Sequence, residues 1–173
     1  VVGLNGFSKT YVMTGWRVGY MYFHDPGNVL EELKEAIARE SRIRLCASTP
    51  VQYAAVKALK GSQKHISKMV RILKERRDHF VRRIRSIKEL SCTTPKGAFY
   101  LFPKISLGDR WKSDKDFAID LVKKTGVLVV NGSGFDQTYG ARHFRVVFLP
   151  PIDVIDEAAD RIEQFVQSKT AKL

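Results

Sequence analysis

The chain has 173 residues, of which 44% are hydrophobic, so it can bury a core and is not a disordered segment. Its 30 Lys and Arg against 18 Asp and Glu give a net charge of +12, which makes nucleic acid, acidic membrane surfaces and anionic small molecules candidate partners. Cys46 and Cys92 lie far apart and outside any Cys/His cluster. We therefore predict no disulfide framework and no metal site, and a cytoplasmic location. No apolar run reaches the roughly 18 residues that span a bilayer, so we predict no membrane partner.

The N-terminal part of the chain is predicted to contain two strands and two helices. Residues 1–4 and 16–23 have the β-branched and aromatic composition of buried strands, with a polar turn between them. A turn signal and helical spacing of apolar residues predict a helix over residues 28–41. An alanine-rich stretch that begins at Thr49 and ends at Gly61 predicts the second helix.

The rest of the sequence predicts a long amphipathic helix over residues 62–87, followed by alternating strands and helices. The strands are predicted at residues 97–102, 127–130 and 143–149, and the helices at 113–126 and 155–166. Lysine and arginine on the long helix interleave with apolar and acidic residues, which is typical of a solvated helix face. The pattern predicts an α/β chain and does not favour a nucleic-acid partner.

Lys9 is the first candidate for chemistry. It follows Ser8 in a Gly/Ser turn between the two predicted strands, and Arg17 stands at the edge of the second strand. A scaffold that holds and desolvates this amine would favour the neutral nucleophile that Schiff-base chemistry requires. From the residues alone, a solvated surface lysine is an equally good interpretation.

The spacing Ser-Lys-x5-Gly-x-Arg-x-Gly-Tyr resembles the lysine signature of class I and II aminotransferases, which are fold-type I enzymes that depend on pyridoxal 5'-phosphate (PLP). It is formed by Ser8, Lys9, Gly15, Arg17, Gly19 and Tyr20. Blocks at residues 42–50, 95–100, 129–135 and 143–151 follow in the family's order, and together they most resemble the alanine aminotransferase branch. The chain departs from the pattern at Asn131, where the wider family has Pro, and at Gly6, where some branches have a phosphate-binding Ser.

The resemblance implies a role for four residues. Lys9 would hold PLP as a Schiff base and then act as the general base, and Ser8 and Arg17 would bind the cofactor's phosphate. Arg145 lies within an apolar strand, where an unpaired guanidinium is costly, so it needs a carboxylate partner. The resemblance makes that partner the α-carboxylate of the amino acid or 2-oxo acid substrate, and an internal salt bridge is the alternative. Tyr100 is expected to be a core or domain-contact aromatic.

The resemblance also implies an architecture. Residues 1–62 would form the C-terminal end of the large PLP-binding domain, residues 63–89 a long linking helix, and residues 90–173 a small C-terminal α/β domain. The full-length protein would be a homodimer. In this family the acidic partner of the pyridine nitrogen lies upstream of the lysine, so we expect these 173 residues alone to have little or no activity.

The implied reaction is reversible, ping-pong amino transfer between alanine and a 2-oxo acid such as 2-oxoglutarate. Aspartate or aromatic amino acid specificity and a PLP-dependent β-lyase of the same fold are the alternatives within the family. A basic nucleic-acid-binding module is the alternative outside it.

Overall fold

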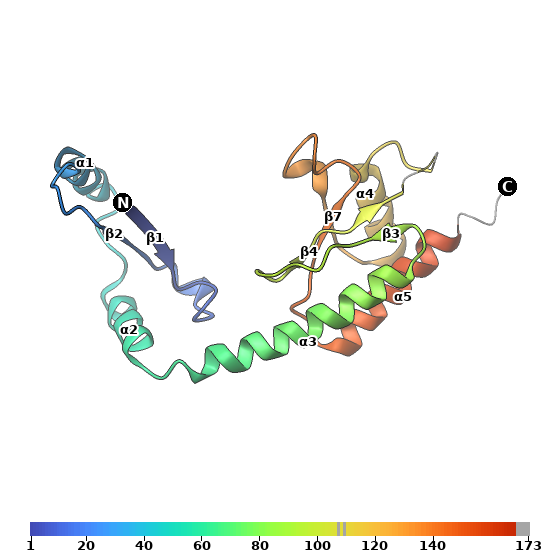
Figure 1. Cartoon of the computed structure of the whole chain (residues 1–173), viewed down its shortest axis with the longest axis horizontal. Helices are drawn as coiled ribbons and strands as arrows, with labels where there is room; N and C mark the ends of the chain where they lie inside the picture. Colours follow the sequence, from blue (N-terminus) through green and yellow to red (C-terminus); the bar gives the residue numbers. More distant parts are fainter. Residues whose placement is uncertain (107, 109, 169–173) are drawn as a thin grey trace. The chain divides into compact units, whose positions relative to one another are not determined.

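The computed structural model describes residues 1–106, 108 and 110–168. The chain divides into two compact units, Val1–Lys68 and Met69–Leu173, and the division falls within the long helix α3 (Lys64–Ser86) (Figure 1). The long helix predicted over residues 62–87 is confirmed, because α3 covers nearly all of that range. The assignment of the chain's parts to the ends of two domains stays a prediction.

The first unit begins with an antiparallel hairpin of β1 (Val2–Gly6) and β2 (Gly19–Phe23). Its connecting loop contains a short 3-10 helix, η1 (Thr14–Trp16), so the second strand begins later than predicted. Both strands are mostly exposed. The prediction that they are buried is wrong for the described residues, because the hairpin forms a two-stranded sheet with no neighbouring strand.

Two helices complete the first unit, and both confirm the predictions. Helix α1 (Glu31–Ser41) follows Asp25, whose carboxylate accepts hydrogen bonds from the N–H groups of Val29 and Leu30. Lys34 lies 2.9 Å from this carboxylate and holds the pKa of Asp25 below its usual range. Helix α2 (Thr49–Lys60) has a proline in its first turn and ends at Gly61.

Among its described residues, the second unit contains two small sheets and three helices, one of which is the C-terminal part of α3. Strands β4 (Tyr100–Leu101), β7 (Phe144–Val147) and β6 (Val130–Asn131) form an antiparallel sheet in that order. Strands β3 (Leu90–Ser91) and β5 (Lys104–Ile105) form the other sheet, and the sequence analysis missed both. The helices are α4 (Asp114–Thr125) and α5 (Ile152–Ser168), and the 3-10 turn η2 (Gly132–Gly134) follows β6.

The core of the second unit lies between these helices and one face of the three-stranded sheet. Leu101, Phe144 and Val146 are buried on that face and belong to one cluster with apolar residues of α3, α4 and α5. Helices α3 and α5 run side by side (Figure 1), and His79 of α3 lies 2.7 Å from Asp156 of α5. Because strand residues alternate between faces, Arg145 lies on the opposite face from Phe144 and Val146.

Several arginines of α3 bond to other parts of the second unit. Arg83 pairs with Asp156 and Asp160 of α5, and Arg85 donates to the carbonyl of Cys92 at 2.8 Å. Arg77 pairs with Asp78 and donates to the carbonyl of Pro95. These cations therefore help to hold the unit together. In the described ranges, no helix combines the length and the apolar character that a membrane span requires.

Candidate functional site

The loop between β1 and β2 carries the lysine motif, and a small apolar core fixes it to α2. Phe7 and Met13 of the loop are buried in one cluster with Ala55 of α2. The N–H of Phe7 donates to the carbonyl of Val18 at 3.3 Å, and the N–H of Met13 donates to the carbonyl of Phe7 at 3.3 Å. The loop is therefore closed by its own backbone and anchored by its apolar residues.

Within this loop, two hydrogen bonds connect Ser8 with Arg17. The Thr14 hydroxyl donates to the carbonyl of Ser8 at 3.0 Å, and Nη1 of Arg17 donates to the carbonyl of Thr14 at 3.0 Å. Lys9 follows Ser8 directly, so the structure brings Ser8, Lys9 and Arg17 together in one bonded loop. The sequence analysis missed Thr14, because the lysine signature leaves that position open.

Two residues of the loop hold the left-handed backbone conformation, Val12 with φ of 55° and Arg17 with φ of 52°. This conformation is unfavourable for a β-branched residue such as Val12. The N–H of Val12 donates to the carbonyl of Lys9 at 3.2 Å, which closes a tight turn immediately after the lysine. The strained residue therefore lies three positions after Lys9, in the turn that its own N–H closes.

The loop residues suit an anionic cofactor. Within residues 1–106, 108 and 110–168, Arg17 forms no ion pair with a carboxylate, so its positive charge is not compensated by the chain. A phosphate ester is bound by such cationic and hydroxyl donors, and Arg17 and Ser8 supply both kinds. Lys9 is exposed, so the desolvation expected from its position between two strands does not come from the described residues.

Arg145, the fourth predicted residue, belongs to the second unit. Its guanidinium carbon lies 4.4 Å from the ring centre of Tyr100 and 4.4 Å from that of Phe135. In the part of the chain that the structure describes, no carboxylate pairs with it. The internal salt bridge considered above is thus not formed by these residues, and two aromatic rings hold the half-buried cation instead.

The sequence analysis missed the role of both rings. Tyr100 was expected to be a core or domain-contact aromatic. It lies opposite Val147 in the β-ladder and shares the face of Arg145, which is not the face of the core. Phe135 is half-exposed and follows η2, and Phe102 contacts its ring edge-on. Only the alternation of Tyr100 with Leu101 could have indicated the position of the first ring.

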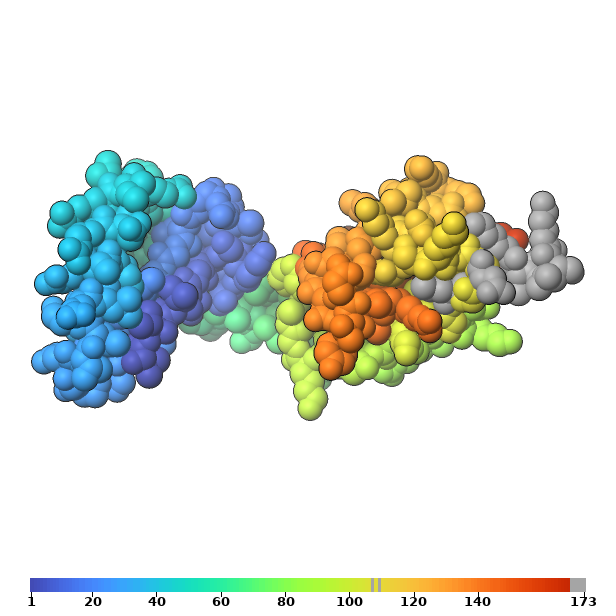
Figure 2. All heavy atoms as spheres, turned by 90° about the horizontal axis from the view of Figure 1, so that it is seen from above, coloured from blue at the N-terminus to red at the C-terminus, as the bar shows by residue number. Residues whose placement is uncertain are grey.

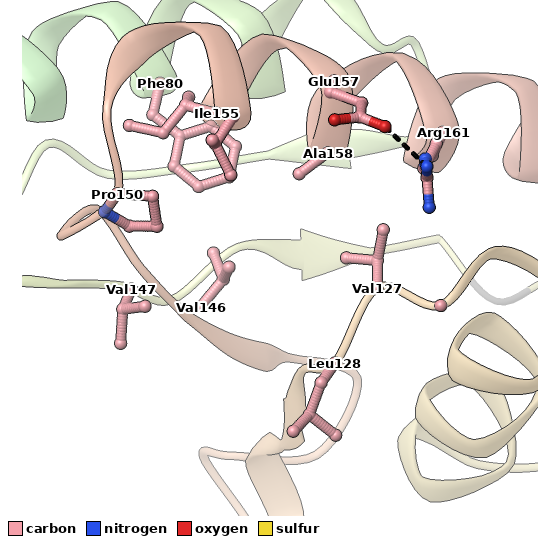
Figure 3. Close-up of a pocket in the computed structure, with 12 residues that line it drawn as sticks. Phe80, Val127, Leu128, Val146, Val147, Pro150, Ile155, Glu157, Ala158 and Arg161 are labelled. Carbon is pink, nitrogen blue, oxygen red and sulfur yellow. Dashed lines mark hydrogen bonds and ion pairs between the residues drawn. The ribbon is translucent and has the colours of Figure 1, made fainter.

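Figure 3 shows a pocket of the second unit. Its volume is about 290 Å³. Apolar residues of α5 and of the segments at Val127 and Val146 line it, and an ion pair between Glu157 and Arg161 stands at one side. Arg145 does not line this pocket. Among the described residues, no group of three or more His, Cys, Asp or Glu side chains could hold a metal ion.

The family model "Aminotransferase class I and II" matches residues 1–162. The chain belongs to this family. Its structure is similar to that of alanine aminotransferase from Pyrococcus furiosus, with a TM-score of 0.92 and 52% identity over 97% of this chain and 42% of that one. Its α/β architecture is accordingly that of the matching part of a fold-type I aminotransferase, and the family depends on PLP.

The names of the curated relatives refer to different amino acid substrates. Aspartate aminotransferase of Sulfolobus acidocaldarius is 34% identical over 94% of this chain and 40% of its own length. Aromatic-amino-acid aminotransferase 2 of Thermococcus litoralis is 35% identical over 97% of this chain and 41% of its own length. The chain thus spans about two fifths of the length of the relatives it matches.

Asp136 makes the stability of the loop after Phe135 depend on pH. Its carboxylate accepts hydrogen bonds from the N–H groups of Tyr139 and Thr138, and these bonds hold its pKa below the ordinary value of 3.8. Because the folded-state pKa is lowered, the contribution of these bonds to stability is present above the unfolded-state pKa and is lost as the pH falls through the folded-state value.

We expect NMR titration of the Thr138 and Tyr139 amide signals to give a midpoint below 3.8. Asp136→Asn keeps an acceptor oxygen but cannot titrate, so the same signals should lose that transition. A midpoint at or above 3.8 in the unmodified chain would contradict the assignment.

Proposed function

We propose that a protein containing this chain is a PLP-dependent aminotransferase that moves the amino group of alanine to 2-oxoglutarate. The observation that carries this proposal is Arg145, a guanidinium held between two rings at 4.4 Å, with no carboxylate partner in the described chain. A ligand that brings its own carboxylate completes such a site. Alanine is favoured because identity to the Pyrococcus furiosus alanine aminotransferase is 52%, against 34% and 35% for the aspartate and aromatic relatives.

In this proposal the lysine loop holds the cofactor. Ser8 and Arg17 would donate hydrogen bonds to its phosphate, and Lys9 would hold it covalently through Nζ. PLP supplies an electron sink for the carbanion that forms at the substrate's Cα. Lys9 Nζ, once exchanged for the substrate's amine, would take the proton from Cα, so one residue serves as anchor and base.

Arg145 would bind and orient the substrate. A guanidinium presents two parallel N–H groups to a carboxylate, and this fork fixes the direction of the bonds at Cα as well as the affinity. The rings of Tyr100 and Phe135 lie 4.4 Å from the guanidinium carbon and would leave its N–H groups to donate to that carboxylate.

Three further assignments rest on the resemblance to the family. They are the domain limits 1–62, 63–89 and 90–173, a homodimeric full-length protein, and little or no activity for these 173 residues alone. The proposed cytoplasmic location rests instead on the two unclustered cysteines, Cys46 and Cys92.

The donor preference is tested by steady-state rates of the full-length protein with alanine, aspartate and phenylalanine, each with 2-oxoglutarate. We expect kcat/KM to be highest for alanine. A higher value for aspartate or phenylalanine would reassign the substrate within the family, and release of pyruvate and ammonia without any 2-oxo acid would indicate a lyase.

The role of Lys9 is tested by borohydride reduction of the PLP-loaded full-length protein, followed by peptide mapping. We expect the label on Lys9 and a loss of at least about 1,000-fold in kcat for Lys9→Ala, because anchor and base are removed together. Lys57→Ala removes an exposed lysine of the same unit and should keep the label and the rate. Label spread over many lysines would contradict the assignment.

The role of Arg145 is tested by comparing alanine with ethylamine, which is alanine without its carboxylate. For Arg145→Gln we expect kcat/KM for alanine to fall at least about 100-fold, because two charge-assisted hydrogen bonds are lost. The value for ethylamine should stay within about twofold. Arg142→Gln removes the same charge from an exposed neighbour and should change neither value. An equal loss for both amines would remove Arg145 from the substrate site.

A further inference from the structure

Asp114 is the one charged residue that is buried in the described ranges, with 4% of its surface exposed. It is the first residue of α4, and its Oδ2 accepts a hydrogen bond from the N–H of Ser133 at 2.7 Å. Burial of a carboxylate is costly unless hydrogen bonds or charges compensate it. The N-terminus of α4 and the Ser133 amide supply that compensation.

Capping of α4 does not account for Asp114. The Ser113 hydroxyl accepts from the N–H of Asp116 at 3.1 Å and donates to the Asp116 carboxylate at 3.0 Å. The first of these bonds is the ordinary N-terminal cap of the helix. Asp114 therefore directs its oxygen away from its own helix, toward the turn η2.

The turn that Asp114 contacts is fixed on several sides. The Asn131 amide donates to the Ser133 hydroxyl at 2.9 Å, and the N–H of Gly132 donates to the carbonyl of His143 at 2.8 Å. A Cβ on Gly132 would lie 2.2 Å from the carbonyl oxygen of Gly140, so the two backbone segments pack without room for a side chain. Figure 2 shows the yellow atoms of α4 against the orange segment that contains η2 and β7.

Phe135 leaves this turn directly, and its N–H donates to the carbonyl of Gly132 at 2.9 Å. Its ring then forms one side of the pair that holds the Arg145 guanidinium. The other ring, Tyr100, is set by the β-ladder between β4 and β7. No polar group among the described residues pairs with the guanidinium, so the two rings set its direction. Of these two rings, only that of Phe135 has a position that depends on the turn η2.

We propose that Asp114 is a positioning residue for the substrate carboxylate site. Its bond to Ser133 holds η2 and places the Phe135 ring, and that ring directs the Arg145 guanidinium. The inference rests on the proposed function of Arg145, because it assigns Asp114 a part in carboxylate affinity rather than in the chemical step.

The test uses the full-length protein loaded with PLP. For Asp114→Ala we expect KM for alanine to rise about tenfold, because a hydrogen bond to a charged acceptor is lost and the guanidinium is no longer directed. We expect kcat, and kcat/KM for ethylamine, to stay within about twofold. Asp114→Asn keeps an acceptor for the Ser133 amide and should recover KM to within about threefold of the original.

Asp116→Ala is the matched control, since it removes a carboxylate from the same helical turn without touching η2. It should lower the melting temperature and leave KM for alanine unchanged. An unchanged KM for alanine in Asp114→Ala would overturn the inference. An equal loss of kcat/KM for alanine and for ethylamine would also overturn it, because general destabilisation gives that result.

Phe135→Ala keeps the test decisive even if Asp114→Ala does not fold. This half-exposed ring should be removable without loss of the fold, and KM for alanine should rise as in Asp114→Ala. In the double variant the two effects should not add, because Asp114 acts through Phe135. No rise for Phe135→Ala, or full additivity, would reject the route through this ring.

A second readout does not depend on turnover. The side-chain protons of Arg145 lie against two rings, so their NMR signals should be displaced by the ring currents, and Asp114→Ala should remove part of that displacement. If Arg145→Gln fails to separate alanine from ethylamine, the proposed function fails. If it separates them and Asp114→Ala changes neither KM nor these signals, only the positioning role fails.

Discussion

The alternation of residues along β7 is the constraint on which the candidate substrate site depends. Phe144 and Val146 are buried in the core beneath α3, α4 and α5, and each contributes about 1.5–3 kcal/mol by leaving water. A slip of one residue would expose both and drive Arg145 into the core, where an unpaired charge is far more costly. The apolar core therefore determines which face presents the guanidinium.

Buried apolar residues also fix the lysine loop, although this cluster is much smaller than the core of the second unit. Phe7 and Met13 bind the loop to Ala55 of α2, and the bonds through Thr14 connect the Ser8 and Arg17 positions. The strained backbone at Val12 persists because these contacts fix the loop on both sides of it. In both units, buried apolar residues near the candidate side chain in sequence fix the backbone that carries it.

The sequence was a good guide wherever the determinants were local. Helix α4 begins after Ser113 and ends before Gly126, whose φ of 75° is the left-handed conformation that often ends a helix. Both the capping serine and the terminating glycine can be recognised in the sequence. Arg145 could be singled out as a candidate because a guanidinium in an apolar strand needs a partner. Phe135 was not found, since its place depends on contacts between η2 and residues distant in sequence. The same reason explains β3 and β5, whose two-residue strands form only through distant pairing.

The ion pairs among the described residues distinguish compensated positive charges from uncompensated ones. Of the cations on the second unit, Arg83 pairs with carboxylates of α5 and Arg161 with Glu157. Arg17 and Arg145, in contrast, pair with no carboxylate among the described residues, although the chain has 18 acidic residues. Each is instead held by neutral groups, a backbone carbonyl in one case and two rings in the other. Cations that the described residues orient but do not neutralise are suited to binding small anions such as a phosphate or a carboxylate.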